Sequence, residues 1–160
     1  MTRRVASSVV AAVACLAAAA AQTQPPAAPP PDVAAVATVI GGFMDALNNA
    51  DIGKFSEFFA PDATMFFPLA PLYLRLENKE QIVKVFTVFF ESVRKGKSGP
   101  NYMNLSPEDL RIQMYGDTAV ATFHFKGTDQ ISRRTVVLAR EKGKWLVVHL
   151  HASGMVVPKE

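Results

Sequence analysis

The sequence predicts an α+β domain in which three N-terminal helices pack on one face of an antiparallel sheet. Between residues 32 and 96, apolar side chains recur every three or four positions, which is the period of an amphipathic helix. From residue 110 onward they alternate with polar side chains in short segments that glycine-containing turns separate. Helices followed by a meander of strands are typical of α+β domains with one covered sheet face.

The first two helices are predicted to follow one another directly. The first spans residues 32–50, with Asp32 as its N-cap. Asp51 caps a short second helix that presents phenylalanines on its buried face, and Pro61 ends it. The apolar stripe of the first helix consists of Val36, Val39, Ile40, Phe43, Met44 and Leu47.

The third helix begins after its N-cap Asn78 and ends at Gly96. Before it, the proline-broken segment 65–76 is predicted to be a short edge strand or extended stretch. The apolar stripe of this helix consists of Ile82, Val83, Phe86, Phe89, Phe90 and Val93. The strands expected after it are residues 110–116, 118–127, 132–141 and 144–153.

The N-terminus has the pattern of a bacterial secretory signal over residues 1–21. Arg3 and Arg4 precede an apolar, alanine-rich run that ends in small residues, so we expect cleavage after residue 21. Lipidation at Cys15 is the second alternative, because the leucine usual three positions upstream is missing. The predicted location is therefore periplasmic or secreted, with no membrane attachment once the signal is removed.

A proline-rich tether, residues 22–31, separates the signal from the predicted domain, residues 32–160. Cleavage removes Cys15, the one cysteine of the 160 residues, and with it disulfides and cysteine-ligated zinc. Without Arg3 and Arg4, 15 of the 17 basic residues remain beside 14 acidic ones, a net charge of +1. This near-neutral balance gives no support to a nucleic-acid partner.

Four segments in this order resemble the nuclear transport factor 2-like, or SnoaL-like, superfamily: FFAPDATMFFP, ENKEQIVKVF, GDTAVATF and RRTVVLAREKGKWLVVHLHASG. The last is most similar to the association (hub) domain of calmodulin-dependent kinases and its bacterial relatives. The resemblance covers about residues 32–157. It implies a cone-shaped α+β barrel, in which a curved sheet wraps a long helix around a pocket, and usually a dimer. Members include isomerases, cyclases, hydratases, dehydratases and domains whose pocket has no known chemistry, so fold alone is a weak guide to function.

The hub resemblance also implies which sheet face lines the pocket. The arginines that bind small anionic ligands in the hub domain fall on Lys126, Val136 and Ala152. Only Lys126 is still basic, which weighs against a hub-like carboxylate pocket. The implied lining is His124, Lys126, Val136, Val148, Leu150 and Ala152, and the implied outer, associating face holds Ala119, Ala121, Phe123, Phe125, Trp145, Val147, His149 and His151.

Two residues are candidates for catalysis. His124 could act as general acid or base, because imidazole titrates near neutrality, and a hydrogen-bonded core histidine is the alternative. Asp62 is a candidate base, and a turn-capping aspartate explains it equally well.

The candidate ligand-binding residues are cationic or phenolic. Tyr73 and Arg75 alternate on one extended segment and would share a face, and Lys126 and Arg134 lie on the sheet. A solvated edge charge is the alternative for Arg134. We expect them to bind a small hydrophobic or mildly polar molecule.

The candidate interface residues are Phe123, Trp145, His149 and His151. The two histidines, two positions apart on a strand, could also chelate a metal with a third ligand. No H-E-x-x-H pattern or nearby carboxylate accompanies them, so we expect interface hydrogen bonds and no metal.

Two functions of different classes are expected. The first is an exported SnoaL-like domain with an apolar pocket for a small organic molecule, with cofactor-free proton-transfer chemistry of the isomerase, dehydratase or cyclase type. The alternative is a non-catalytic binding or oligomerisation module. Either would form a homodimer or higher homo-oligomer. The sequence has no nucleotide-binding glycine loop, haem motif or nucleophile elbow, so no cofactor is expected.

Overall fold

The structure is a computed structural model that describes residues 30–68 and 74–157. The predicted signal, Cys15, nearly all of the predicted tether and Tyr73 lie outside these residues. The elements in chain order are α1 (Pro31–Asn48), α2 (Ile52–Glu57), β1 (Phe59–Phe66), α3 (Lys79–Lys95), β2 (Glu108–Tyr115), β3 (Thr118–Lys126), β4 (Gln130–Glu141) and β5 (Lys144–Val156). Within the described ranges, no helix is long and apolar enough to cross a membrane.

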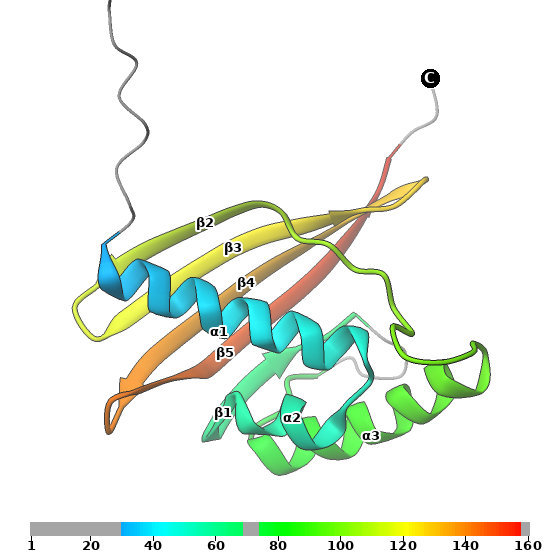
Figure 1. Cartoon of the computed structure of the whole chain (residues 1–160), viewed down its shortest axis with the longest axis horizontal. Helices are drawn as coiled ribbons and strands as arrows, with labels where there is room; N and C mark the ends of the chain where they lie inside the picture. The colour runs from blue at the N-terminus through cyan, green and yellow to red at the C-terminus, as the bar shows by residue number, and fades with distance from the viewer. Residues whose placement is uncertain (1–29, 69–73, 158–160) are drawn as a thin grey trace, which may run out of the picture.

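The strands form one curved, open sheet in the order β1-β5-β4-β3-β2, which confirms the predicted α+β class. Strands β2 to β5 make the predicted antiparallel meander. Strand β1 differs from expectation, because it starts at Phe59 and runs parallel to β5. Figure 1 shows α1 lying across the sheet, with α2 and α3 gathered beside β1.

Local signals place most helix ends where the sequence predicts them. The carboxylate of Asp51 accepts from the Lys54 backbone N–H at 3.0 Å, and the Asn78 side chain accepts from Gln81 N–H at 2.9 Å. Each satisfies one of the free N–H groups at a helix start.

Two ends differ from the prediction. Helix α2 ends at Glu57, before Pro61, which lies in β1. The start of α1 also differs. The helix begins at Pro31, whose fixed φ suits the first helical position, so Asp32 lies in the first turn and is not the N-cap. Its carboxylate instead pairs with the Arg140 guanidinium of β4 and also lies favourably at the positive end of the helix dipole. The ion pair joins the start of α1 to the sheet.

A cluster of phenylalanines joins the three helices to β1. Phe55 of α2 has no exposed surface, and its ring centre lies 4.5 Å from that of Phe86 and 5.0 Å from that of Phe59. Phe43 of α1 and Phe90 of α3 complete the contacts, at 5.4 and 5.3 Å from Phe55. Burial of large rings in such close packing supplies much of the stability of a small domain.

The sheet has two faces with different surroundings. We call the face that packs against the helices the inner face and the opposite one the outer face. A register shift opposite Val137 and Leu138 leaves Val148 as an extra residue in β5. Val147 before the bulge and Leu150 after it therefore both point inward, although they are three positions apart. The buried inner-face residues are Ala119, Ala121, Phe123, Phe125, Val136, Leu138, Trp145, Val147, Leu150 and Ala152.

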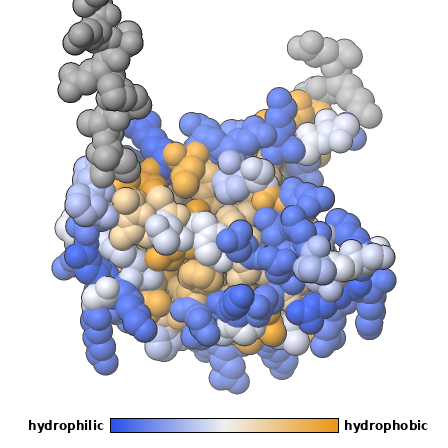
Figure 2. All heavy atoms as spheres, in the orientation of Figure 1, coloured by the Kyte–Doolittle hydropathy of each residue, from blue (hydrophilic) through white to orange (hydrophobic). Residues whose placement is uncertain are grey.

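Figure 2 views the molecule from the side of α1. Apolar residues gather over the middle of this side, where α1 crosses the sheet, and hydrophilic residues surround them. The small side chains Ala34 and Ala35 and the glycine Gly41 belong to the exposed surface of α1. The helix therefore covers the inner face with its large residues and presents small ones outward.

Candidate functional site

A small cavity lies between the helices and the inner face of the sheet, with a volume of about 70 Å³. Residues of α1, α3, the segment after β1, the segment before β2 and the inner sheet face form its walls. Apolar spaces between the layers of a fold are common binding sites for small molecules. The lining consists of Phe43, Leu47, Phe67, Phe86, Phe89, Met103, Leu105, Phe123, Phe125, Arg134 and Leu150.

Arg134 is the one charged residue of this described lining. It pairs across the sheet with Phe123 on one side and Ala152 on the other, both inner-face residues. Its guanidinium carbon lies 5.0 Å from the centre of the Phe125 ring, within cation–π range. Burial lowers the pKa of Arg134 to about 10, so the side chain keeps its charge at neutral pH.

The segment that closes the cavity before β2 is tied to α1. The Asn48 side chain donates to the Leu105 carbonyl and accepts from the Leu105 N–H, each at 2.9 Å. The Met103 N–H also donates to the Asn48 carbonyl at 3.1 Å. These bonds hold Met103 and Leu105 over the cavity although the segment is neither helix nor strand.

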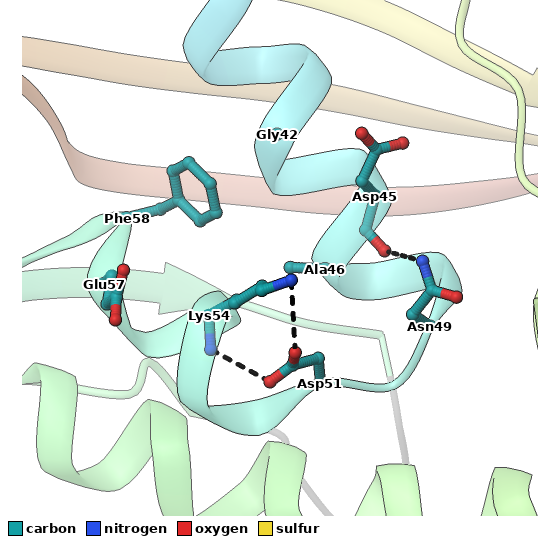
Figure 3. Close-up of a pocket in the computed structure, with 8 residues that line it drawn as sticks. All are labelled: Gly42, Asp45, Ala46, Asn49, Asp51, Lys54, Glu57 and Phe58. Atoms are coloured by element: carbon teal, nitrogen blue, oxygen red, sulfur yellow. Dashed lines mark hydrogen bonds and ion pairs between the residues drawn. The ribbon is translucent and has the colours of Figure 1, made fainter. Parts of the chain in front are cut away.

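A wider hollow of about 640 Å³ lies at the junction of α1 and α2 (Figure 3). Two of its charged side chains serve the start of α2, since the Lys54 ammonium lies 3.9 Å from the Asp51 carboxylate that caps this helix. The Asn49 side chain donates to the Asp45 carbonyl at 2.9 Å. Lys54 and Asn49 are exposed, Asp51 is half-buried, and all three bind their own chain neighbours, so we take the apolar cavity as the candidate site.

The structure corrects the predicted inward direction of His124 and Lys126. Val136 pairs with Ala121, and His124 pairs with Arg133, so the residues of β3 that share a face with Val136 are the alanines and phenylalanines. His124 lies on the outer face, with its Nε2 3.6 Å from a Glu108 carboxylate oxygen. A choice of face that is wrong by one residue reverses every side chain of a strand.

The same geometry corrects two of the four interface candidates. Phe123 and Trp145 are buried on the inner face, 4 % and 8 % exposed, where Phe123 lines the cavity. The indole ring of Trp145 lies 4.6 Å from the guanidinium carbon of Arg140. The bulge at Val148 explains the inward direction of Trp145, because Trp145 would share a face with His149 in a regular strand.

His149 and His151 lie on the outer face, in the direction that the sequence predicts. The Nδ1 atom of His149 lies 2.8 Å from the Thr64 hydroxyl oxygen, and the Phe66 ring packs beside both imidazoles. Burial lowers the pKa of His149, and the positive charges of His151 and Arg75 lower it further. Among the described residues, no group of three His, Cys, Asp or Glu is arranged to hold a metal ion.

The remaining candidates do not come together. Asp62 is exposed on β1, and the Arg75 guanidinium pairs with the Glu77 carboxylate at 3.0 Å on the surface. Of the three predicted ligand-binding residues that the structure describes, Arg134 alone lines the cavity. The sequence places Phe123 and Phe125 on the outer face and does not predict that they form a wall of the cavity. Alternation along β3 does group these two residues on one face.

Comparisons with known proteins agree with this architecture. A family model described as SnoaL-like domain matches residues 36–158. A search of curated proteins finds no match. Three similar solved structures each superpose on about three quarters or more of the chain, at identities that show the fold alone.

The first of these is an NTF2-like protein of unknown function from Pseudomonas putida KT2440. It is 24 % identical, with a TM-score of 0.63 over 76 % of this chain and 87 % of that one. A ketosteroid isomerase-like protein from Erwinia carotovora atroseptica SCRI1043 is 18 % identical, with a TM-score of 0.63 over 80 % and 98 %. The association domain of CaMKII from C. elegans is 17 % identical, with a TM-score of 0.58 over 76 % and 95 %.

Proposed function

The chain belongs to the SnoaL-like family, and we propose that its apolar cavity binds a small, largely apolar organic molecule. The observation that carries this proposal is the composition of the cavity wall. Seven of its lining residues are phenylalanines or leucines from the helices and the sheet, namely Phe43, Leu47, Phe86, Phe89, Phe123, Phe125 and Leu150, and Arg134 lies among them. Apolar walls with a single polar group both hold and orient a ligand.

Binding is the part of the predicted function that this geometry supports best. A guanidinium stays protonated and positions a ligand, but it does not exchange protons at neutral pH. His124, the predicted acid or base, lies on the opposite face of the sheet from the cavity. Proton-transfer chemistry and export to the periplasm therefore stay predictions, which an activity assay and N-terminal sequencing of the exported protein would test.

A titration of the full chain with butyramide and with 2-butanone, two neutral four-carbon probes, followed by NMR, tests the binding proposal. We expect amide shifts that cluster at Phe123, Phe125 and Leu150. Leu105→Trp should abolish them, because the larger side chain grows into the cavity while the backbone bonds to Asn48 remain. The matched control Leu110→Trp lies at an exposed position of β2 and should leave them unchanged. Shifts that are absent, or that survive Leu105→Trp, would overturn the proposal.

A second function, self-association through the outer face, is favoured by a row of side chains that crosses all the strands. Phe66, His151, Thr135, Thr122 and Arg111 are successive cross-strand partners. The Phe66 side chain is 39 % exposed, and the threonines beside it are half-buried. The row joins apolar and hydrogen-bonding groups on one broad sheet surface, which suits a homodimer. Similarity to an association domain agrees with this second function.

A further inference from the structure

One part of the cavity wall belongs to a segment that is neither helix nor strand. Residues 97–107 lead from α3 to β2, and Met103 and Leu105 of this segment line the cavity. Both side chains are half-buried, as expected of a wall between the cavity and solvent. Apart from Phe67, the rest of the described lining belongs to α1, α3 and the sheet, whose backbones carry their own regular hydrogen bonds. The segment is therefore the part of the wall that can move most easily.

Asn48 makes every hydrogen bond that joins residues 97–107 to other described parts of the chain. Its side chain donates to the Leu105 carbonyl and accepts from the Leu105 N–H, each at 2.9 Å. Its backbone carbonyl, which has no partner inside the helix because Asn48 is the last residue of α1, accepts from the Met103 N–H at 3.1 Å. We call these three bonds the clasp.

The end of α1 that carries Asn48 is fixed independently of this segment. Leu47 and Ala50, on either side of it, are buried in the core. The Arg94 guanidinium of α3 donates a hydrogen bond to the Ala50 carbonyl, so α1 is also tied to the next helix. When the clasp opens, α1 stays in place and residues 97–107 are the part that moves. Local opening of this kind is expected where few hydrogen bonds hold the backbone.

We propose that Asn48 is a specificity-determining residue, whose clasp sets the largest ligand that the cavity admits. With the clasp closed, the cavity has a volume of about 70 Å³, less than half of the roughly 150 Å³ that holds a benzene molecule in an apolar protein cavity. Displacement of Met103 and Leu105 enlarges it. A ligand of benzene's size has to open the clasp, and its affinity is lowered by the fraction of molecules that are open. This inference rests on the proposed binding function and names what limits the size of the ligand.

Amide hydrogen exchange of the ligand-free full chain tests the clasp itself. The Met103 N–H is the informative probe, because its acceptor is the backbone carbonyl of residue 48, which Asn48→Ala retains. Loss of the two side-chain bonds to Leu105 should make exchange at Met103 at least about tenfold faster. The matched control Asn49→Ala removes a side-chain bond within α1, to the Asp45 carbonyl, and should leave exchange at Met103 unchanged.

Titrations of the full chain with 2-butanone and with toluene, followed by NMR shifts of the cavity residues, test the limit on ligand size. Asn48→Ala should bind toluene at least about tenfold more tightly than the unmodified protein does, because less free energy is needed to open the clasp. The affinity for 2-butanone should change by less than about twofold. Asn49→Ala should leave both affinities unchanged. Asn48→Asp keeps the acceptor for the Leu105 N–H and loses the donor, so it should show a smaller gain for toluene.

Each outcome decides between the proposals. Exchange at Met103 that stays the same in Asn48→Ala, or that rises equally in Asn49→Ala, would overturn the clasp and leave the binding function in place. Faster exchange without a gain in toluene affinity would show that the segment opens but does not limit ligand size, and would also overturn the inference. Failure of 2-butanone and toluene to shift any cavity residue in any variant would overturn the binding function itself.

Discussion

The Arg134 guanidinium lies over the ring of Phe125, with its central carbon 5.0 Å from the ring centre. The two residues come from neighbouring strands, β4 and β3, and both line the apolar cavity. The ring offers the cation a partial counter-charge that is weaker than a carboxylate. Arg134 is thus held in place by Phe125 and Ser132 while its charge remains available to a ligand.

Arg134→Met should stabilise the ligand-free protein. The substitution removes a partly buried charge, keeps an unbranched side chain against Phe125, and ends the desolvation cost that lowers the arginine's pKa. We expect the thermal unfolding midpoint to rise by about 3 °C, which corresponds to roughly 1 kcal/mol for a domain of this size. Differential scanning calorimetry measures it. A lower midpoint than that of the unmodified protein would contradict the cost assigned to this charge.

Protonation of His149 should make the fold less stable in mild acid. Its pKa is lowered in the folded state, so the unfolded chain binds the proton more tightly. The free energy of unfolding therefore decreases as pH falls below the ordinary histidine pKa of 6.5. Unfolding midpoints measured from about pH 8 to pH 5 should fall more steeply for the unmodified protein than for His149→Gln. Parallel curves would show that His149 does not contribute.

Phe55→Ala should destabilise the protein strongly, because Phe55 is fully buried and contacts rings from α1, α3 and β1. Truncation of such a ring costs about 4 kcal/mol through lost burial and the cavity left behind. Urea unfolding measures this loss. Val88→Ala, at a position of α3 that is 66 % exposed, should change stability by less than about 0.5 kcal/mol. Similar losses for the two variants would contradict the placement of the core.

Thr135→Arg should dissociate the proposed homodimer without unfolding the subunit. Thr135 lies near the middle of the outer-face row, so two copies would bring like charges together. Sedimentation velocity should show a dimer for the unmodified chain and a monomer for the variant. The exposed substitution Val88→Arg should leave the dimer intact. An unmodified chain that sediments as a monomer, or a Thr135→Arg variant that remains a dimer, would refute association through this face.

The α+β class, three helices and the meander of strands follow from the sequence because their signals are local. Asp51 and Asn78 bind backbone N–H groups three residues away, and Lys142-Gly143 forms a turn with both φ angles positive. The spacing at which apolar residues recur distinguishes a helix from a strand within a single segment. These features depend on residues that are neighbours in the chain, and the structure places them where the sequence does.

The sides of the sheet were decided by tertiary structure. Along β5, strict alternation groups Trp145 with His149, but the bulge at Val148 places Trp145 on the inner face with Leu150. Along β3, the pairing of Ala121 with Val136 turns Phe123 to the cavity and His124 away from it. A bulge or a one-residue change in register moves side chains to the opposite face of the sheet, although the alternation of apolar and polar residues in the sequence hardly changes. The sequence therefore determined which elements form, and long-range pairing and packing decided that Arg134 faces the cavity.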